Sequence, residues 1–245
     1  MHLVAELRNI IQYTMSNLTI IKGNIFNSKA QTIVNTVNCV GVMGKGIALV
    51  FKLRYPNMFD IYKQYCAARL IDIGKLWLYK GESNAPWVLN FPTKTHWKLP
   101  SEYIYIEKGL RKFVDTYKEK GITSIAFPLL GANNGGLDKD VVMDLMVNYL
   151  KECDIPIEIY QYDPKAPDDL FETFKSNWMH ISYEQKKNML KTNKRIEMID
   201  SAVLSENVHS MIALIDYPGI GIKSLGSCYD FVMNMRDDST LPGIG

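Results

Sequence analysis

Two glycine-rich loops occur in the same context in this sequence, and each separates a strand-like segment from a helix-like one. Loop one, Gly41–Gly46, lies between TIVNTVN and IALVFKL. Loop two, Gly131–Gly136, lies between ITSIAFP and KDVVMDLMVNYL. A helix that begins behind such a loop presents free backbone N–H groups, which bind anions. In an α/β sheet, ligands collect at the carboxyl ends of the strands, so two such loops could cradle two linked phosphates.

Two interpretations of these loops compete. Each loop can serve only as a tight turn between a strand and a helix, and for one loop alone this structural interpretation is favoured. Loop one does not match the Walker A motif, because Lys45 is followed by Gly46 and not by serine or threonine. The repeated strand–loop–helix context favours the other interpretation, and we predict a ligand site formed by both loops.

Strand-like and helix-like segments alternate over the first two thirds of the chain. The strand-like segments are rich in β-branched and aromatic residues, and the helix-like segments have apolar residues at helical spacing. This alternation predicts an α/β sandwich with a largely parallel or mixed sheet. Strands are expected at 18–24, 32–38, 75–80, 86–93, 122–130 and 156–163. Helices are expected at 3–15, 46–56, 58–70, 138–153 and 101–121, the last capped by Ser101 and Gly121.

The pattern changes at DPKAPDD (163–169), where two prolines and three acidic residues indicate a boundary. We therefore expect one domain at 1–165, with its core at 17–165 and a short leading helix. The remaining residues, 166–245, are polar and helix-like, which predicts a helical extension that is small for a fully independent core. Helical segments are expected within it at 183–204, 206–216 and 228–238.

The composition excludes several classes of protein. Apolar residues make up 47% and charged residues 22%, which is ordinary for a globular protein with a full core. The net charge of +2 does not indicate a nucleic-acid binder, although a local basic surface remains compatible with it. The four cysteines are scattered without zinc-site spacing, so we expect no metal, no disulfide and a reducing cytoplasm. Neither a signal peptide nor a membrane-spanning segment is expected.

Several motifs agree in order and spacing with one known family. IIKGN, IVNTVNCVGVMGKGIALVFK, NFPTK and IAFPLLGANNGGLD together resemble a macrodomain, the module that binds ADP-ribose. NTVNCVGVMGKGIA and NFPTKTHW resemble its DNA ADP-ribosyl glycohydrolase branch, the DarG-type antitoxins. The resemblance covers about 17–165. It implies a three-layer sandwich with a mixed sheet and an enzyme without a cofactor.

The resemblance also implies roles for individual residues. Asn24 stands where macrodomains have an acidic residue that contacts adenine, and its carbonyl can still accept that hydrogen bond. Asn38 is expected to orient the distal ribose, and the two loops to enclose the ribose and the diphosphate. The residues expected to bind ADP-ribose are Asn24, Ile25, Thr36, Asn38, Gly41, Val42, Met43, Gly44, Lys45, Gly46, Ile47, Thr93, Gly131, Ala132, Asn133, Asn134, Gly135 and Gly136.

Lys94, which follows NFPT, is the residue that the resemblance implies for cleavage, with Asn38 beside it. Glycosidic bonds are usually cleaved by a pair of carboxylates, and no such pair stands near the two loops in the sequence. A partly desolvated lysine can act instead as a nucleophile or as a proton donor and acceptor. The sequence leaves both roles open, and without the motif a solvated surface lysine would be the default.

The segment after Lys94 suggests the substrate. His96, Trp97 and Lys98 place an aromatic ring among cations, which suits single-stranded nucleic acid. The alternative is a loop anchored by a buried tryptophan. The resemblance implies ADP-ribose on a DNA base, thymidine in the relatives, and a DarT-like DNA ADP-ribosyltransferase toxin as a partner. Two other hypotheses stay open, namely a reader that binds ADP-ribose without turnover and an antitoxin that acts by protein contact.

Other polar residues have structural alternatives. Asn35 is expected to make a structural bond to the backbone, and Cys39 to be a packed thiol. Tyr160 or Tyr162 would either stack on adenine or belong to the core. A run of cations in the extension would either contact DNA or a partner, or form a solvated face. These cations are Lys186, Lys187, Lys191, Lys194 and Arg195.

Overall fold

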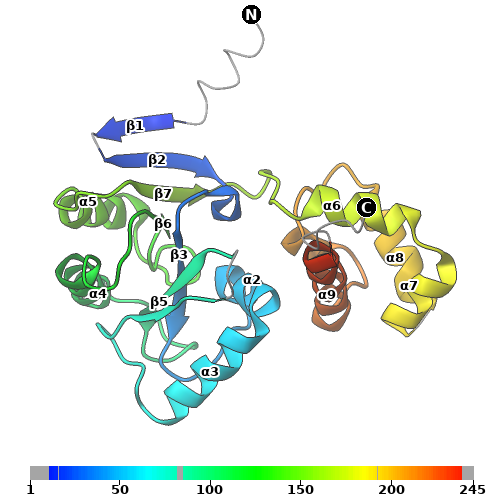
Figure 1. Cartoon of the computed structure of the whole chain (residues 1–245), viewed down its shortest axis with the longest axis horizontal. Coiled ribbons are helices and arrows are strands. Elements are labelled where there is room, and N and C mark those ends of the chain that lie inside the picture. Colours follow the sequence, from blue (N-terminus) through cyan, green and yellow to red (C-terminus); the bar gives the residue numbers. More distant parts are fainter. Residues whose placement is uncertain (1–10, 16, 82–84, 192, 239–245) are drawn as a thin grey trace, which may run out of the picture. The chain divides into compact units, whose positions relative to one another are not determined.

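The computed structural model describes residues 11–15, 17–81, 85–191 and 193–238 of the chain, which divides into two compact units (Figure 1). The first, which we call the sheet unit, ends at Asp163, and the second, the helical unit, begins at Pro164. The DPKAPDD segment therefore contains the division. No helix among the described residues is long and apolar enough to cross a membrane.

The sheet unit contains one mixed seven-stranded sheet, in the order β1-β2-β7-β6-β3-β5-β4. The five strands from β2 to β5 in this order run parallel, and the edge strands β1 and β4 are antiparallel to their neighbours. All six expected strands are present. The strands are β1 (Ile11–Met15), β2 (Leu18–Gly23), β3 (Thr32–Asn38), β4 (Trp77–Tyr79), β5 (Trp87–Lys94), β6 (Ile125–Pro128) and β7 (Ile157–Tyr162).

The expected leading helix at 3–15 is wrong for residues 11–15, the part of it that the structure describes. Residues 11–15 form strand β1, which pairs antiparallel with β2 from Ile11↔Ile21 to Met15↔Leu18, while residues 3–10 lie outside the described residues. The backbone groups on the free side of β2 need partners, and a short hairpin supplies them. This tertiary demand outweighs the helical spacing of the apolar residues.

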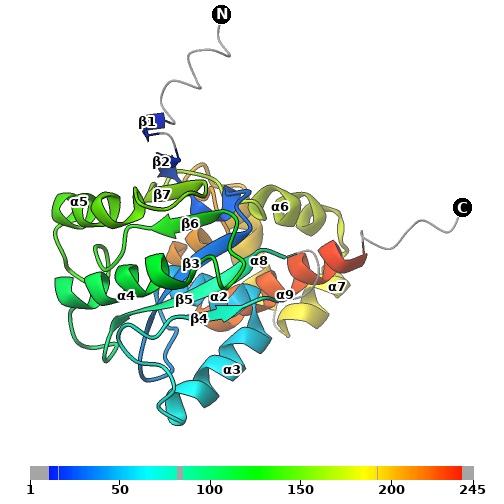
Figure 2. The same cartoon turned by 60° about the vertical axis from the view of Figure 1, so that its left-hand side comes forward.

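Helices cover both faces of the sheet, which makes the unit a three-layer sandwich (Figure 2). Helices α2 (Gly46–Arg54) and α3 (Pro56–Ala67) pack on one face, and α4 (Tyr103–Thr116) and α5 (Lys139–Leu150) on the other. A short 3₁₀ helix, η1 (Ile25–Asn27), follows β2. The α/β fold is therefore confirmed. Ser101 is not the cap of α4, because its amide donates to Gly135 and Glu102 occupies the cap position instead.

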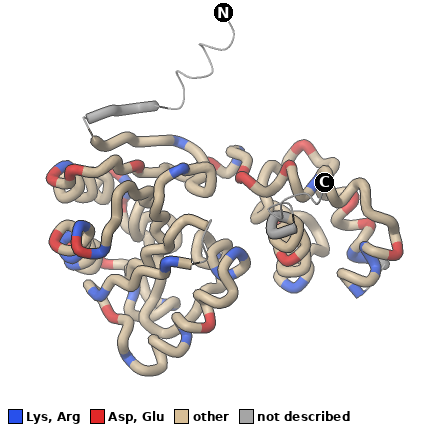
Figure 3. The backbone as a smooth tube through the Cα atoms, in the orientation of Figure 1, with Lys and Arg blue, Asp and Glu red and all other residues tan. Residues whose placement is uncertain are grey.

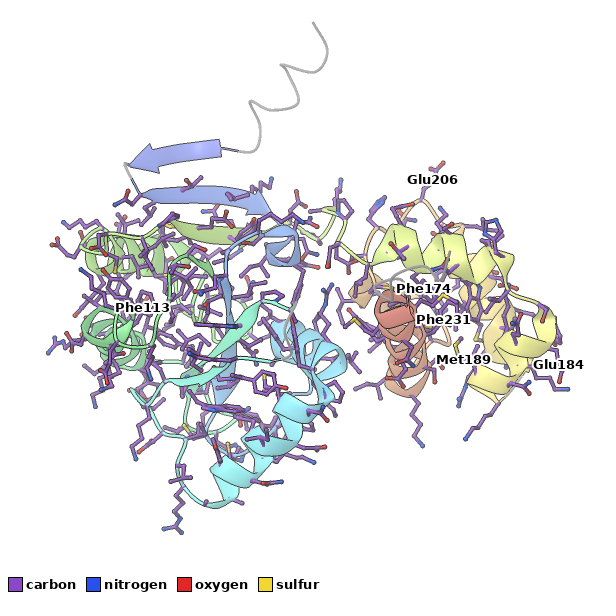
Figure 4. The ribbon with its side chains drawn as sticks, in the orientation of Figure 1. Phe113, Phe174, Glu184, Met189, Glu206 and Phe231 are labelled. Atoms are coloured by element: carbon purple, nitrogen blue, oxygen red, sulfur yellow. The ribbon has the colours of Figure 1, made fainter. Side chains whose placement is uncertain are left out.

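The helical unit has a buried aromatic centre of its own. Its elements are α6 (Phe171–His180), α7 (Tyr183–Leu190), α8 (Asn193–Val203), η2 (Ile212–Asp216) and α9 (Ile222–Asp238). Phe174 and Trp178 stack at 5.7 Å, and Phe231 meets Phe174 edge-on at 6.1 Å. Figure 4 shows Phe174 and Phe231 in the interior between α6 and α9, with Glu184 and Glu206 directed outward.

Three sequence expectations for the helical unit differ from the structure. The helix expected at 206–216 is only the short 3₁₀ helix η2, and residues 206–211 are not helical. The expected helix at 183–204 is divided into α7 and α8, because Lys191 takes a left-handed conformation with φ 57° and ends α7. Helix α9 begins at Ile222, six residues before the helical segment expected at 228–238.

We predict that Gly109→Ala destabilises the sheet unit. Gly109 lies on the buried face of α4, where an added Cβ would overlap the ring of Phe91 on β5. Phe91 is fully buried and cannot withdraw without displacing its neighbours, so overpacking should cost about 1–3 kcal/mol of unfolding free energy. Chemical denaturation measures this loss. The matched control is Gly221→Ala, whose Cβ would meet no atom within 4 Å; equal unfolding free energies for the two variants would contradict the prediction.

Candidate functional site

The site is built where neighbouring strands β3 and β5 end. Their last residues, Asn38 and Lys94, are partners in the pairing of these strands. Lys94 Nζ donates a hydrogen bond of 2.5 Å to the backbone carbonyl of Asn134 in loop two. Partial burial lowers the pKa of Lys94, which increases the share of neutral amine near neutral pH. The structure thus brings Asn38, Lys94 and loop two together.

The Asn38 side chain holds the first half of loop one in place. Its Oδ1 accepts hydrogen bonds from the amides of Val40 and Val42 at 3.0 and 3.3 Å. Its Nδ2 donates to the carbonyl of Val42 at 2.6 Å. The hydroxyl of Tyr62, which is fully buried on α3, donates to the Asn38 carbonyl at 2.5 Å. Asn38 is therefore a positioning residue for the loop, in addition to any contact that it makes with a ligand.

A pair of buried side-chain amides on β3 and β5 lies beneath loop one and contacts its residue Met43. Asn35 on β3 donates through Nδ2 to Oδ1 of Asn90 on β5 at 2.9 Å. The same Nδ2 lies 3.9 Å from Sδ of Met43, the buried member of loop one. The structural role expected for Asn35 is correct, although its partner is a side chain and not the backbone. A buried amide is costly unless it is paired, so this pair fixes the register of β3 against β5.

Loop one ends at the N-terminus of α2, and this helix end has no side-chain cap. The N-cap is Lys45, and Gly46 begins the helix with φ +58°. A Cβ at Gly46 would overlap the side-chain amide of Asn134. The left-handed φ favours glycine at this position, and the contact shows that the two loops touch. The side chain of the N-cap residue Lys45 makes no hydrogen bond to the first N–H groups of α2, which leaves them available to an anion.

Loop two has a different construction. Gly135 is buried, and a Cβ there would overlap the carbonyl of Gly131 and the Ser101 hydroxyl. Its glycine is thus required by packing within the protein. The N-terminus of α5 is capped by Asp138, whose Oδ1 accepts from the amides of Asp140 and Val141. Loop two can therefore contact a ligand through the exposed side chains of Asn133 and Asn134, whereas loop one can contact it through the backbone N–H groups at the start of α2.

The remaining residues expected to bind ADP-ribose lie around this edge of the sheet. Asn24 caps η1, and its Oδ1 accepts from the Phe26 amide at 3.2 Å. Ile25 is buried in η1. Thr36 on β3 is half-buried and Thr93 on β5 is buried, while Ile47 is half-buried at the start of α2. Ala132 is buried and Gly136 exposed in loop two.

The tyrosines of β7 separate into two environments. Tyr160 is 7% exposed and belongs to the core, where burial raises the pKa of its hydroxyl. Tyr162, at the end of the strand, is 51% exposed. Of the two, Tyr162 has the open ring that stacking would require.

The segment after Lys94 presents an exposed aromatic surface. The Trp97 side chain is 49% exposed, so the alternative of a loop anchored by a buried tryptophan is wrong. The His96 ring stacks on Trp97 at 5.7 Å, and Lys98 Nζ lies 5.1 Å from the centre of the indole. This arrangement holds the indole face beside a cation, which suits an unpaired base and its phosphate.

The cation run of the helical unit does not form one surface. Lys186 is 9% exposed, and its Nζ pairs with Asp200 at 2.9 Å while lying over the ring of Trp178. Its role is structural, and the interpretation as a DNA contact is wrong for this residue. Lys187, Lys191, Lys194 and Arg195 are exposed around the α7–α8 junction (Figure 3).

Cys39 is half-buried, so the packed thiol expected from the sequence is confirmed only in part. Burial raises the pKa of its thiol to about 11, so it is protonated at neutral pH and is not a nucleophile. Among the described residues, no group of three histidine, cysteine or acidic side chains gathers to hold a metal ion.

Sequence reasoning missed two supporting residues, Tyr62 and Asn90. Tyr62 lies on the amphipathic α3, where a tyrosine is ordinary, and only the fold brings it to Asn38. Asn90 is an isolated amide in an apolar strand. Together with Asn35 it could have been recognised as half of a buried pair.

We predict that Asn38→Ala loosens loop one without unfolding the protein. The variant loses the acceptor for two loop amides and the donor to the Val42 carbonyl. Amide hydrogen exchange at Val40 and Val42 should therefore accelerate by about tenfold or more, because each lost bond contributes about 1 kcal/mol. Asn38→Asp keeps the acceptor and should show a smaller increase. Unchanged exchange at these two amides in Asn38→Ala would show that the loop is fixed by other contacts.

Comparison with known proteins gives consistent results. The Macro domain family model matches residues 34–146. Over 170 residues the chain is 39% identical to a DNA ADP-ribosyl transferase-DNA ADP-ribosyl glycohydrolase fusion protein of Thermosipho africanus, with 62% of this chain and 44% of that protein covered. The solved structure of Thermosipho africanus DarTG in complex with ADP-ribose is similar with a TM-score of 0.58 and 41% identity, covering 61% of this chain and 42% of that one.

A second similar solved structure is of a shorter chain, which this protein covers almost completely. The macrodomain of Mycobacterium tuberculosis DarG has 42% identity and a TM-score of 0.56, with 58% of this chain and 96% of that chain covered. The chain spans less than half of the length of the curated glycohydrolases that it matches. The match falls on the sheet unit and includes both loops and Lys94 within residues 34–146. From the fold, the two loops and these relatives together, the chain belongs to the macrodomain family.

Proposed function

We propose that the sheet unit binds ADP-ribose at the edge formed by its two loops and hydrolyses the bond between ADP-ribose and a DNA base. The observation that carries the proposal is the position of Lys94. Its amine is held by the Asn134 carbonyl at the point where β3, β5 and loop two meet, opposite Asn38. A solvated surface lysine would have neither this fixed partner nor a pKa lowered by burial.

The construction of the loops supports a diphosphate at α2. The N-terminus of α2 has no side-chain cap, whereas that of α5 is filled by Asp138. An anion is stabilised by free N–H groups and by the helix dipole, so we assign the diphosphate to loop one and α2. Loop two then closes over it from the Asn134 side. At the adenine end, the Asn24 carbonyl already accepts from the backbone, but a carbonyl oxygen can accept a second hydrogen bond.

The proposed chemistry takes place at the anomeric carbon of the distal ribose. In its neutral form the Lys94 amine has a lone pair that can attack this carbon, and the bond to the base nitrogen breaks while the base takes up a proton. Water then releases ADP-ribose from the lysine. In the other role, the amine accepts a proton from the attacking water and forms no covalent bond to the sugar. Both roles need the neutral amine, and partial burial, which lowers the pKa of Lys94, increases the share of that form.

The DNA assignment is supported by the surface beside Lys94. Trp97 is exposed, and Lys98 lies next to its ring. The two relatives named above are a DNA ADP-ribosyl glycohydrolase fused to its transferase and a DarG macrodomain. We infer that the modified base belongs to single-stranded DNA, with thymidine as the expected nucleoside, and that the protein acts in the cytoplasm as an antitoxin to a DNA ADP-ribosyltransferase.

Replacement of Lys94 separates an enzyme from a reader. We expect Lys94→Ala to bind ADP-ribose with nearly unchanged affinity in calorimetry, because the lysine acts mainly in the transition state. Its turnover of ADP-ribosylated single-stranded DNA should fall by at least about a hundredfold. The activity of the unmodified protein should rise with pH up to the lowered pKa of Lys94, because the neutral amine is the working form.

Three further results would distinguish the possible roles of Lys94. Lys94→Arg should also be inactive, because a guanidinium is not deprotonated in proteins. If the amine is the nucleophile, the ribose ring of the lysine adduct can open to an imine, and borohydride added during turnover should reduce this imine and link ADP-ribose to the protein. No such link should form if the amine only transfers protons. A normal rate for Lys94→Ala would refute the mechanism, and an unmodified protein that binds ADP-ribose but cleaves nothing would be a reader.

The same variant tests the antitoxin role in cells. If hydrolysis protects the cell, Lys94→Ala should fail to rescue cells that express the partner transferase. If the helical unit instead inhibits the toxin by direct contact, the variant should still protect them.

We also predict that Gly44→Val weakens ADP-ribose binding. A Cβ at Gly44 would meet only the Val42 side chain, at 3.8 Å, so the variant should fold normally. Its side chain would occupy the open face of loop one before α2, where the diphosphate is assigned. We expect the dissociation constant of ADP-ribose to rise about tenfold or more in calorimetry, which is a loss of about 1.4 kcal/mol. Gly221→Val, also in open space, is the control, and equal affinities for the two variants would move the diphosphate elsewhere.

A further inference from the structure

A second cavity adjoins loop one on the side of α3. Its volume is about 630 Å³, within the range of about 300–1,000 Å³ that is usual for small-ligand sites. Val40, Ala67 and Ile71 give it apolar walls, and Lys63, Arg69 and Asp72 give it charges. Gly41 of loop one, a residue expected to bind ADP-ribose, also lines the cavity, whereas Lys63, Arg69 and Asp72 have no role in the proposed function.

Loop one separates this cavity from the edge assigned to ADP-ribose. The far end of the loop faces loop two, because Gly46 touches Asn134. The near end faces α3, because a Cβ at Gly41 would lie 3.6 Å from both Cys66 Cβ and Lys63 Cα. A ligand bound in front of the far end can therefore continue past the near end into the cavity.

The cavity also lies next to the reacting residues along the chain. Cys39, which lines it, directly follows Asn38. The Cys39 amide donates to the carbonyl of Thr95 at 3.3 Å, and Thr95 directly follows Lys94. Whatever is attached to the anomeric carbon near Lys94 thus leaves the site beside the cavity. In the proposed function this attached group is a DNA base with its strand.

Arg69 is the cation of the cavity that is open to a ligand. Lys63 is already paired with Asp60 at 2.8 Å, and an oxygen of Asp72 accepts from the amide of Ile73. Among the described residues, the Arg69 guanidinium has no ion-pair partner. The pKa of Cys39 is raised to about 11 by burial, so its thiol adds no negative charge to the wall.

The backbone of Arg69 provides a second, independent observation. Arg69 follows the last turn of α3 with φ +56°, and Leu70 N bonds back to the carbonyl of Tyr65. This left-handed position after a helix is normally occupied by glycine. A residue with a side chain costs about 1 kcal/mol or more there. Strain of this kind that persists at the mouth of a cavity points to a function for the side chain.

We propose that this cavity holds the DNA nucleotide next to the modified base, with the Arg69 guanidinium on its phosphate and the apolar walls around its base. The proposal rests on the proposed function, because the strand enters from the glycosidic bond at Lys94. A planar guanidinium with several donors suits a phosphate. Trp97 lies beyond Lys94 on the same segment and would contact the strand on the other side of the modified base.

Arg69→Gly is the test, because this substitution relieves the backbone strain and removes only the side chain. The thermal midpoint should stay equal or rise. The KM for an ADP-ribosylated single-stranded oligonucleotide should rise about tenfold, as expected for one hydrogen-bonded charge. The slope of log affinity against log salt should become shallower by about 0.7. The dissociation constant of free ADP-ribose should stay within about twofold, because ADP-ribose has no neighbouring nucleotide.

Lys191→Gly is the matched control. Lys191 has the same strained conformation, with φ 57°, at the end of α7, and its removal deletes one positive charge from the helical unit. Its KM for the oligonucleotide should equal that of the unmodified protein. Arg69→Lys should keep the salt slope of the unmodified protein, because it keeps the charge.

Four outcomes would overturn the proposal. The KM for the oligonucleotide could stay unchanged in Arg69→Gly, or it could rise equally in Lys191→Gly. Arg69→Gly could lose affinity for free ADP-ribose to the same extent as for the oligonucleotide, or it could lose binding of a protein partner while its oligonucleotide kinetics stay intact. If the unmodified protein does not cleave the oligonucleotide, the proposed function fails on its own. The cavity is then judged by direct binding of the modified oligonucleotide, and equal dissociation constants for the unmodified protein and Arg69→Gly would reject it.

Discussion

The pairing of β3 with β5 at their carboxyl ends is the constraint on which the site depends. It sets Asn38 opposite Lys94, and each residue then controls one loop. Asn38 fixes loop one through three side-chain hydrogen bonds, and Lys94 contacts loop two through the Asn134 carbonyl. The pairing shifts by one residue between Val37 and Asn38, so that Asn38 lies opposite Lys94 and not Thr93. The register is therefore a functional property as much as a structural one.

Buried amides protect that register. Asn35 and Asn90 pair across the same two strands, and Met43 of loop one rests on this pair. Each amide would cost about 1–3 kcal/mol if its partner were lost, so alternative pairings of these apolar strands are disfavoured. Apolar residues at these positions could stabilise the sheet equally well, but they would not specify one alignment. The polar groups under loop one thus contribute specificity where the site requires an exact geometry between strands.

The two glycine loops are similar in sequence but differ in physical role. Loop one leads to a helix end that has no side-chain cap, whereas the helix after loop two is capped by Asp138. Glycine is favoured at Gly46 by its left-handed φ, where the loops touch, and is required at Gly135 because loop two packs on itself. The strained Arg69 stands on the other side of loop one. Loop one thus lies between the edge assigned to ADP-ribose and the cavity that contains Arg69, and the bond to be cleaved would lie where the loop leaves β3.

The sequence predicts the six strands β2 to β7 and the four helices around them, because periodicity and loop chemistry are local properties, and its motifs carry the macrodomain resemblance. It also pointed to Asn38 and Lys94 through motifs. The sequence does not predict that residues 11–15 pair with β2, that Lys186 is buried against Asp200, or that Tyr62 supports Asn38. These features depend on partners far away in the chain, and the free energy of such contacts is absent from any local pattern.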